Sequence, residues 1–568
     1  MVIRYNVLHV KLSVFLYSVC ILWLCGGIKA QNYPQTYFSS PLDIPLYASG
    51  NFAEIRSGHF HSGQDIRTNE KTGYPVYSPA DGYVSRIKVQ IYGGGKNLYI
   101  THPNGYTTVY MHLERYAPQI EEYLKEYQYK NHRYELDISL NANQIQVQKG
   151  ATIAYTGNSG GSAGPHLHYE IRNTANQQTI NPLLFALPIE DTSAPYFAAV
   201  MVKGDDYVAV NKPFDTITAS GEEFYFCIEA YDRSNGSTAR NGVYSTEVFV
   251  NDKLLYACNI RKFAFDQTTY VNALIDYELY ITKSRTMLMT KQLKHNHFPS
   301  VFYHDGGVLK DNSPQLYTVR IVLTDFSGNK NDYIFFLDAH FHQPLPKETD
   351  HNVLSFNCET ENIYTFADNS TITIPKGALY ADVTINESPN DQSQINETNR
   401  QSKYYIPQSE LIPLHKDITV RLNLNPIPQY LRSKAVILRN GASLGGKVDG
   451  NHISTNSSFF GTFSLAVDTV APSVKPRNFK DNARLSPDVT ALQLTINDDL
   501  SGIASYNAYL NGRWILLEYD GKRSAVTLDL NEMHIADPVT LVEGRNTLKI
   551  EVADRTGNIT TKEYTIIK

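Results

Sequence analysis

The stretch GPHLHYEIR, residues 164–172, places two histidines one residue apart, directly after a Gly-Pro turn. Side chains alternate between the two faces of a β-strand, so His166 and His168 project to one side and Leu167 to the other. Two imidazoles on one face can share a metal ion, or one can bind the metal while the other moves protons. A His-x-His pattern on a strand is more often ordinary surface chemistry, so its meaning depends on partners elsewhere in the chain.

The segment GHFHSGQDI supplies the first partners, His61 and Asp65. On a straight strand these two residues would be about 13 Å apart, too far for one ion. Gly63 lies between them and permits a sharp bend. A histidine and a carboxylate across such a turn are a credible pair of zinc ligands. The same spacing also suits a simple turn that is capped by its aspartate.

A third histidine lies in TTVYMHLERY, residues 107–116. Val109, Met111 and Leu113 alternate with Tyr110 and His112, which predicts a strand with one packed face. The other face would present the tyrosine and the histidine to a cleft or to solvent, with the tyrosine as a further hydrogen-bond donor or a rim aromatic.

Together, these fragments resemble the M23 family of metallopeptidases, the lysostaphin-type (LytM-like) zinc endopeptidases of bacterial cell walls. HSGQD at 61–65 matches the family's H-x-G-x-D, and YMHL at 110–113 matches its Y-x-H-L. GNSGGSAGPHLHYE at 157–170 is similar to its Gly/Ser loop and G-P-H-L-H-F-E strand. SPADGYV is similar to its A-x-x-D-G-x-V strand. The resemblance covers about residues 50–185, and the conjunction is far more specific than any one fragment.

The resemblance implies that His61, Asp65 and His168 are ligands of a Zn²⁺ cofactor and that His112 and His166 are the unliganded catalytic histidines. Two neutral imidazoles and one carboxylate leave the Zn²⁺ site net positive, with a fourth position for a water. The pKa of such a water falls to about 7, so it can act as the nucleophile. No HExxH motif provides a glutamate base. The two free histidines are therefore expected to act as general base and oxyanion stabiliser, in an order that the sequence leaves open.

The function implied by the resemblance is a zinc-dependent endopeptidase that hydrolyses peptide cross-links of bacterial peptidoglycan, with D-amino-acid cross-links favoured over glycine bridges. One alternative is a non-catalytic cell-wall-binding or regulatory protein that activates other wall hydrolases. Such relatives usually lack one or more ligands, whereas this chain keeps all five residues. Another alternative is a surface adhesin whose later domains carry the function.

Composition and the N-terminal segment limit which of these functions are compatible with the sequence. The 568 residues are too many for one core and predict three or four domains. The net charge of -6 and the lack of Lys/Arg-rich blocks argue against nucleic-acid binding. Residues 1–30 have the charged, apolar and small-residue order of a signal peptide, or of an anchor if uncut. Cys20 and Cys25 lack the preceding small residue of a lipoprotein signal. We therefore expect a secreted or periplasmic protein of the bacterial envelope.

The fold class expected for the chain is mainly β. Residues 31–190 read as an antiparallel β peptidase domain, interrupted by a helical insertion near 118–131 that would border the cleft. A weak repeat follows: DTSAP at 191–195 and DTVAP at 468–472, DRSNG at 232–236 and DDLSG at 498–502, TDFSGN at 324–329 and ADRTGN at 553–558. These units predict Ig-like β-sandwiches at 191–345 and 468–568, with a third β-sandwich at 346–467 between them.

The sequence says less about binding partners and disulfide bonds than about the zinc site. The substrate partner would be peptidoglycan peptides, and the sandwich domains are candidates for contact with another envelope protein. The mature chain has three cysteines, Cys227, Cys258 and Cys358. A bridge between the first two and three free thiols are equally compatible with the sequence.

Overall fold

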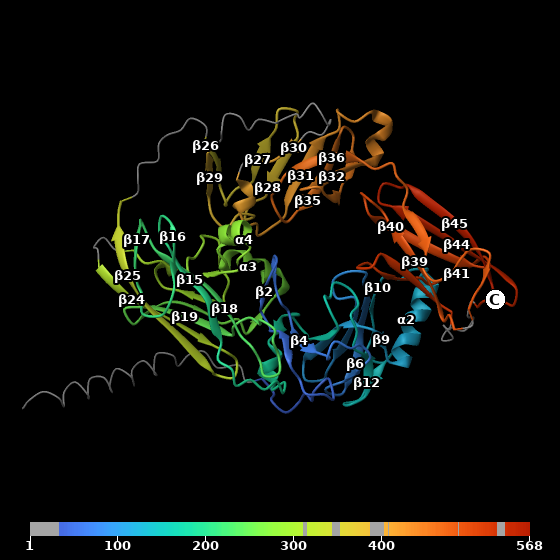
Figure 1. Ribbon diagram of the computed structural model, residues 1–568, viewed down its shortest axis with the longest axis horizontal. Helices are drawn as coiled ribbons and strands as arrows, with labels where there is room; N and C mark the ends of the chain where they lie inside the picture. Colours follow the sequence, from blue (N-terminus) through green and yellow to red (C-terminus); the bar gives the residue numbers. More distant parts are fainter. Residues whose placement is uncertain are drawn as a thin grey trace, which may run out of the picture.

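The computed structural model describes residues 33–310, 315–343, 353–386, 403–406, 408–486, 488–530 and 540–568. The signal peptide expected at residues 1–30 lies outside these ranges. Among the described helices, none is both long enough and apolar enough to cross a membrane. The architecture is mainly β, as the sequence predicts, with an N-terminal antiparallel sheet followed by β-sandwich layers (Figure 1).

The histidine-bearing domain is built on an antiparallel sheet with the strand order β1-β4-β13-β8-β7-β6-β10. Its central strands place fully buried apolar side chains on one face, among them Ile66, Leu167 and Ile171. This face forms the core, and the polar face carries the histidines. The strands are β1 Ala48–Gly50, β4 Gln64–Arg67, β6 Gly82–Val89, β7 Lys96–Thr101, β8 Tyr106–Leu113, β10 Leu136–Ser139, β11 Gln146–Val147, β13 His166–Asn173 and β14 Thr179–Ile180.

Smaller elements complete this domain. A second sheet has the order β5-β12-β9, and β2 pairs with β3. The bounds are β2 Ile55–Arg56, β3 His59–Phe60, β5 Pro75–Tyr77, β9 Arg115–Tyr116, β12 Thr152–Tyr155 and the 3-10 helix η1 Pro182–Phe185.

The helix expected near 118–131 is present as α2, Pro118–Asn131. Proline occupies its first turn, where a backbone N–H has no helical partner, and His132 ends it in the left-handed conformation. The spacing in the sequence also predicts that Ile120, Tyr123, Leu124 and Tyr127 share one face of this helix. Ile120 and Leu124 are buried in the domain core, whereas Tyr127 is exposed.

The first sandwich packs a sheet of order β16-β15-β18-β22 against one of order β17-β25-β24-β19-β20-β23. A short strand of this region, β21, pairs with β14 and so extends the histidine-bearing sheet. The strands are β15 Tyr196–Lys203, β16 Tyr207–Val210, β17 Thr216–Gly221, β18 Tyr225–Tyr231, β19 Ser245–Val250, β20 Lys253–Cys258, β21 Lys262–Phe263, β22 Leu288–Met289, β23 Val301–Tyr303, β24 Gln315–Thr324 and β25 Lys330–Phe341. Its helices are η2 Phe265–Tyr270, α3 Val271–Leu274, α4 Tyr277–Lys283 and η3 Asp305–Gly307.

The middle sandwich combines sheets of order β27-β28-β31-β35-β34 and β30-β36-β32-β33, with β26 paired to β29. The strands are β26 Val353–Phe356, β27 Asn362–Thr365, β28 Thr371–Ile374, β29 Val383–Asn386, β30 Lys403–Tyr404, β31 Ile418–Asn423, β32 Ala435–Arg439, β33 Ala442–Gly445, β34 Lys447–Asp449, β35 His452–Ser457 and β36 Phe463–Val467. Two 3-10 helices join them, η4 Ser409–Leu411 and η5 Gln429–Lys434.

The last sandwich packs β37-β39-β43-β42 against β38-β45-β44-β40-β41. The strands are β37 Ser473–Pro476, β38 Ala483–Arg484, β39 Ala491–Asn497, β40 Ile503–Leu510, β41 Arg513–Ile515, β42 Glu518–Asp520, β43 Ala525–Asp529, β44 Arg545–Asp554 and β45 Ile559–Ile567.

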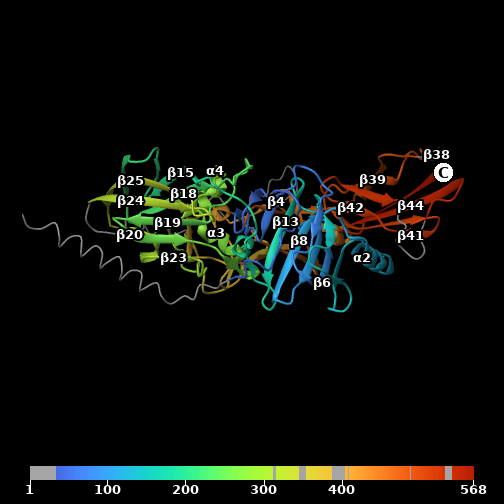
Figure 2. The ribbon, with the colours of Figure 1, turned by 90° about the horizontal axis from the view of Figure 1, so that it is seen from below.

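The chain closes into a ring in which the last sandwich returns to the histidine-bearing domain beside α2 (Figure 1). Viewed from below, the parts lie in one flat layer (Figure 2). Buried Lys96 of β7 and Lys125 of α2 form ion pairs of 3.0 and 2.9 Å with Glu518 of β42. Trp514 stacks on His132 at the end of α2. The insertion is therefore the platform on which the last sandwich docks.

The three cysteines are free thiols in the structure. Cys227 and Cys358 are buried, and Cys258 is partly buried. Of the two alternatives that the sequence leaves open, the structure has the one without a bridge.

Candidate metal centre

Three segments bring the predicted residues together. Strand β13 pairs with β4 on one side and with β8 on the other, with His168 opposite both Asp65 and Met111. His61 lies just before β4, beyond a bend at Gly63. The strand pairing explains why residues about 100 positions apart in sequence face one another.

Gly63 is required by close approach. A Cβ atom at this position would lie 2.5 Å from the carbonyl oxygen of Tyr169 and 2.8 Å from Nε2 of His168. Only glycine lets the chain pass this close to β13. The bend expected from the sequence therefore also brings the first histidine against the strand that carries the last one.

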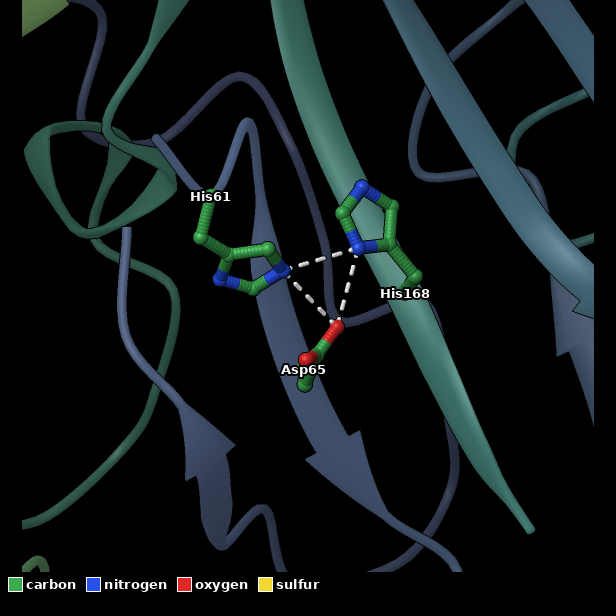
Figure 3. A group of neighbouring side chains, drawn as sticks. All are labelled: His61, Asp65 and His168. Carbon is green, nitrogen blue, oxygen red and sulfur yellow. Dashed lines mark hydrogen bonds and ion pairs between the residues drawn. The ribbon is translucent and has the colours of Figure 1, made fainter. Parts of the chain in front are cut away.

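Figure 3 shows that His61, Asp65 and His168 point toward one another. Nε2 of His61 lies 3.0 Å from Oδ1 of Asp65 and 3.0 Å from Nδ1 of His168. That Nδ1 atom lies 2.9 Å from the same carboxylate oxygen. All three residues are at most 5% exposed. Three ligand-type atoms thus form a small, buried triangle.

The outer contacts of the two rings set their tautomers. Nδ1 of His61 lies 2.7 Å from the carbonyl oxygen of Asn51, which can only accept, so Nδ1 carries the proton. Nε2 of His168 lies 3.0 Å from Oε1 of Glu170, so it donates to this carboxylate. When the two rings are neutral, the nitrogens that point into the triangle carry lone pairs and no proton. The triangle consists of three acceptors, and it requires a shared positive charge.

The donor set fits Zn²⁺. Two imidazole nitrogens and one carboxylate oxygen are common zinc ligands, and a tetrahedral ion with bonds of about 2.0–2.1 Å spaces its ligand atoms about 3.3 Å apart. The edges of 2.9–3.0 Å need only a small expansion to reach this spacing. One proton on His168 would satisfy part of the triangle, whereas a divalent ion satisfies all three atoms at once.

The pKa shifts of these residues also indicate that the site favours a positive charge. Burial opposes the charged form of His168, but Asp65 and Glu170 outweigh it and raise its pKa to about 9. Burial also opposes ionisation of Asp65, yet the three surrounding histidines hold the pKa of this carboxyl well below its usual range. For His61, burial prevails over Asp65 and lowers the pKa.

Two charged residues support the ligands from outside. Arg56 donates from Nη2 to Oδ2 of Asp65 at 2.7 Å. Glu170 is fully buried, accepts from His168 and from Arg172, and also from the hydroxyl of Ser62 at 2.5 Å. From the sequence, Arg56 could bind a substrate carboxylate and Glu170 could orient a ligand histidine, with a structural salt bridge favoured for both. Both do form ion pairs, but each pair also contacts a predicted ligand.

His112 and His166 lie side by side next to the triangle, with ring centroids 4.8 Å apart. Nδ1 of His112 donates to the carbonyl oxygen of Ser159 at 2.9 Å, and Nδ1 of His166 donates to that of Gly164 at 2.9 Å. Nε2 is then the nitrogen that each ring turns away from its loop carbonyl. Nε2 of His166 lies 3.4 Å from Oδ1 of Asp65.

His112 has an uncommon backbone conformation for a histidine in a strand, with φ at 62°. This left-handed residue breaks the alternation of β8, and backbone strain of this kind is often held at functional sites. Burial and the neighbouring His166 and His168 lower the pKa of His112 to about 3. It is therefore a neutral ring, able to accept a proton.

The loop that holds these two histidines is itself held by the last sandwich. Lys522 donates from Nζ to the carbonyl oxygen of Ser162 at 3.0 Å and to the backbone and side-chain oxygens of Asn158. A pocket of about 610 Å³ lies between this loop and the last sandwich, with Ser159 and Pro165 on one wall and Lys522 on the other. The last sandwich thus forms one side of the space next to the site, a role that no sequence signal indicated.

Other residues weighed from the sequence are placed elsewhere. Tyr110 is wrong as a cleft residue: it is fully buried in the core, and its hydroxyl interacts with Oγ1 of Thr108. It packs against Tyr169 because the two residues are opposite each other in the β8–β13 pair. His59, which precedes His61 by two residues, is exposed and takes no part in the triangle.

Comparison with known proteins agrees with this geometry. Residues 59–129 and 125–182 match the model of Peptidase family M23. Residues 354–468 match the model of the Zu5-like domain. The first M23 segment contains His61, Asp65 and His112, and the second contains His166 and His168.

Individual relatives resemble only part of the chain. An uncharacterized metalloprotease of Haemophilus influenzae is 36% identical over 128 residues, which are 22% of this chain and 21% of that protein. The DD-carboxypeptidase/endopeptidase Mpg of Neisseria meningitidis is 29% identical over 187 residues, 32% of this chain and 36% of that protein. A zinc-containing peptidase of Vibrio cholerae is 26% identical, with a TM-score of 0.20, over 27% of this chain and 40% of that one. The chain therefore spans about a fifth to a third of these curated relatives.

Proposed function

We propose that this chain, whose residues 59–182 form a Peptidase M23 domain, is a zinc-dependent endopeptidase that hydrolyses peptide cross-links of bacterial peptidoglycan. One observation carries the proposal: three buried acceptor atoms of His61, Asp65 and His168 converge within 3.0 Å of one another. A divalent cation would satisfy all three atoms at once, and the donor types favour zinc over calcium or magnesium.

Each residue has a distinct proposed role. His61, Asp65 and His168 hold the metal. A bound Zn²⁺ supplies Lewis acidity that polarises the scissile carbonyl and acidifies a water. Asn51 and Glu170 fix the tautomers of the two ligand rings through their outer nitrogens, at 2.7 and 3.0 Å.

His112 and His166 are the proposed proton-handling pair. Because Nδ1 of each ring donates to a loop carbonyl, each presents Nε2 as its reacting atom. A neutral His112 accepts the proton of the attacking water as general base. The proton that His112 takes from the water passes on to the leaving amine, and a protonated His166 donates a hydrogen bond to the oxyanion. Burial keeps the ring of His112 neutral, so its Nε2 is free to accept a proton.

The proposed bond is a cross-link between D-amino acids. Relatives in Neisseria meningitidis and Vibrio cholerae are named DD-carboxypeptidase/endopeptidase and peptidoglycan DD-endopeptidase. The proposed place of action is the bacterial envelope, reached by secretion or export to the periplasm, where peptidoglycan lies. Contact with another envelope protein through the sandwiches is a further proposal, which has no support in the contacts described above.

The test combines metal content with product analysis. The mature chain is purified, its zinc is measured by mass spectrometry, and peptidoglycan digests are analysed for muropeptides. We expect about one zinc at this centre and cleavage of cross-linked dimers. His168→Ala should lose this zinc and essentially all cleavage, because two remaining ligands bind weakly.

His59→Ala is the matched control, since His59 is exposed and lies only two residues from a ligand. It should keep both zinc and activity. A wild-type chain that contains zinc but leaves the muropeptide profile unchanged would contradict the endopeptidase and favour the regulatory alternative. A chain without zinc would contradict the metal centre itself.

A further inference from the structure

The internal repeat of the sequence has a structural counterpart that the peptidase site does not use. Its aspartates converge in space, Asp191, Asp232 and Asp325 in the first sandwich. In the last sandwich the matching residues Asp468, Asp498 and Asp554 converge in the same way. In each group, one carboxylate oxygen from each residue lies within 4.8 Å of the other two.

Two of the three aspartates of the first cluster are buried. Asp232 is 3% exposed and Asp325 is 1% exposed. The nearest basic residues in sequence are turned to aromatic rings: the guanidinium of Arg233 lies over Tyr196 at 5.0 Å, and that of Arg240 over Tyr231 at 5.4 Å. Among the described residues of this sandwich, no ion pair involves these carboxylates. Burial and the other two aspartates raise the pKa of Asp232 to about 7, as expected for acids that share a site without a cation.

A second observation points to a ligand. Oδ1 of Asp232 is buried and has no hydrogen-bond partner among the described residues. The same holds for the hydroxyl of Ser234 and for both amide atoms of Asn241, a fully buried residue. Buried polar groups are normally satisfied, so four unpaired atoms within ten residues indicate a missing partner.

The backbone aims the Asn241 amide at the cluster. Asp232 and Asn241 exchange two backbone hydrogen bonds, of 2.8 and 2.9 Å, as an antiparallel bridge. Residues directly opposite in such a pair project their side chains to the same face, with Cβ atoms about 5 Å apart. The amide of Asn241 therefore stands beside the carboxylate of Asp232.

We propose that Asp191, Asp232 and Asp325, together with Asn241 and Ser234, form a Ca²⁺ site at the start of the first sandwich. All the donors are oxygens, which excludes a preference for zinc and suits a hard cation. Ca²⁺ accepts six to eight oxygens in irregular geometry, whereas Mg²⁺ keeps several waters and suits a dry, all-protein site poorly.

The site lies at the junction with the peptidase domain. Asp191 begins the DTSAP segment between the two domains. The side chain of Asn51 donates to the carbonyl oxygen of Gly242, next to Asn241, while its own carbonyl accepts from the zinc ligand His61. A bound calcium would fix the first sandwich against the segment that orients His61.

Calcium binding is tested without any activity measurement, so its failure is separate from failure of the proposed peptidase. The zinc-loaded mature chain is titrated with CaCl₂ by calorimetry, and its Tm is measured with CaCl₂, with MgCl₂ and with chelator. We expect calcium to bind and to raise the Tm by about 3 °C or more. Magnesium at the same concentration should have little effect. No heat and no Tm shift with calcium would overturn the proposal.

The variant Asp232→Asn separates a metal site from a merely structural aspartate. It removes one of three crowded charges, so in chelator its Tm should equal or exceed that of the wild type. It should also lose the calcium response. A variant that is destabilised in chelator, yet still responds to calcium, would overturn the assignment. Asp498→Asn, the matching change in the last sandwich, is the control and should retain the response that Asp232→Asn removes.

Discussion

At the scale of single residues, the candidate centre depends on which nitrogen of each histidine carries the proton. His61 and His168 use opposite ring nitrogens toward the triangle, Nε2 and Nδ1 respectively. The sequence motif supplies the two histidines but says nothing of this choice. Asn51 and Glu170 make it, through contacts to the outer nitrogens.

Glu170→Gln tests this outer contact. The amide keeps the size of the side chain but loses the charge that holds Nε2–H of His168. Removing such outer-shell partners usually lowers metal affinity by about 10-fold to 100-fold. We expect a weaker zinc affinity of this order, measured by competition with a chelator, and a matching loss of activity at limiting zinc.

The control for this change is Glu122→Gln on the exposed side of α2. It should leave zinc affinity unchanged. Equal affinities for Glu170→Gln and the wild type would show that the Asp65 and His61 contacts alone fix the ring of His168.

At the scale of elements, the loop at 157–164 connects the last sandwich to His112 and His166, the proposed proton-handling pair. Its carbonyls accept from His112 and His166, and two of its residues accept from Lys522. The sequence predicts a Gly/Ser loop here through its similarity to the M23 pattern. It cannot predict a lysine that reaches the loop from about 360 positions further along the chain.

Lys522→Met should loosen this loop and misplace both rings. We expect kcat to fall by about 10-fold, because geometric errors near 1 Å at reacting groups cost this much or more. Zinc content should be unchanged, since Lys522 does not contact the ligands. Faster hydrogen exchange of residues 157–164, measured by mass spectrometry, would report the loosening directly.

Two control variants accompany this prediction. Lys522→Arg keeps the charge and the donors and should restore much of the rate. Lys562→Met, on an exposed position of β45, should behave as the wild type. An unchanged exchange rate in Lys522→Met would show that the loop is rigid without the last sandwich.

At the scale of the whole molecule, Glu518 pairs with two lysines where the last sandwich contacts the histidine-bearing domain. Burial opposes its ionisation, but Lys125 and Lys96 outweigh burial and hold its pKa well below the usual range. A carboxyl whose folded pKa is depressed contributes stability above its unfolded pKa, near 4.5, and loses it as the pH falls below that value.

We therefore expect the last sandwich to undock in acid, below about pH 4. Small-angle scattering should then show a longer molecule while the individual sandwiches remain folded. In Glu518→Gln the docking should be weaker at neutral pH and should lose most of this acid dependence. A radius of gyration that is constant from pH 7 to pH 3 in the wild type would contradict the prediction.

The sequence by itself determined the local chemistry of this protein. Strand alternation put His166 and His168 on one face, the H-x-G-x-D segment supplied two more donors, and period-3.6 spacing marked the helix at 118–131. These signals are local because side-chain periodicity and turn residues act over a few positions. The resemblance of four short motifs then connected them into one site.

Only the tertiary structure decided what lies between distant segments. It buried Tyr110, which alternation alone would place in the cleft, because its partner Tyr169 faces the core. It gave α2 a second role as a docking platform and brought the repeat aspartates together. The contacts of α2 and Lys522 depend on the mutual packing of whole domains, which leaves no local pattern in the sequence. The repeat marks Asp191, Asp232 and Asp325 in the sequence, but only the fold of the first sandwich brings their carboxylates together.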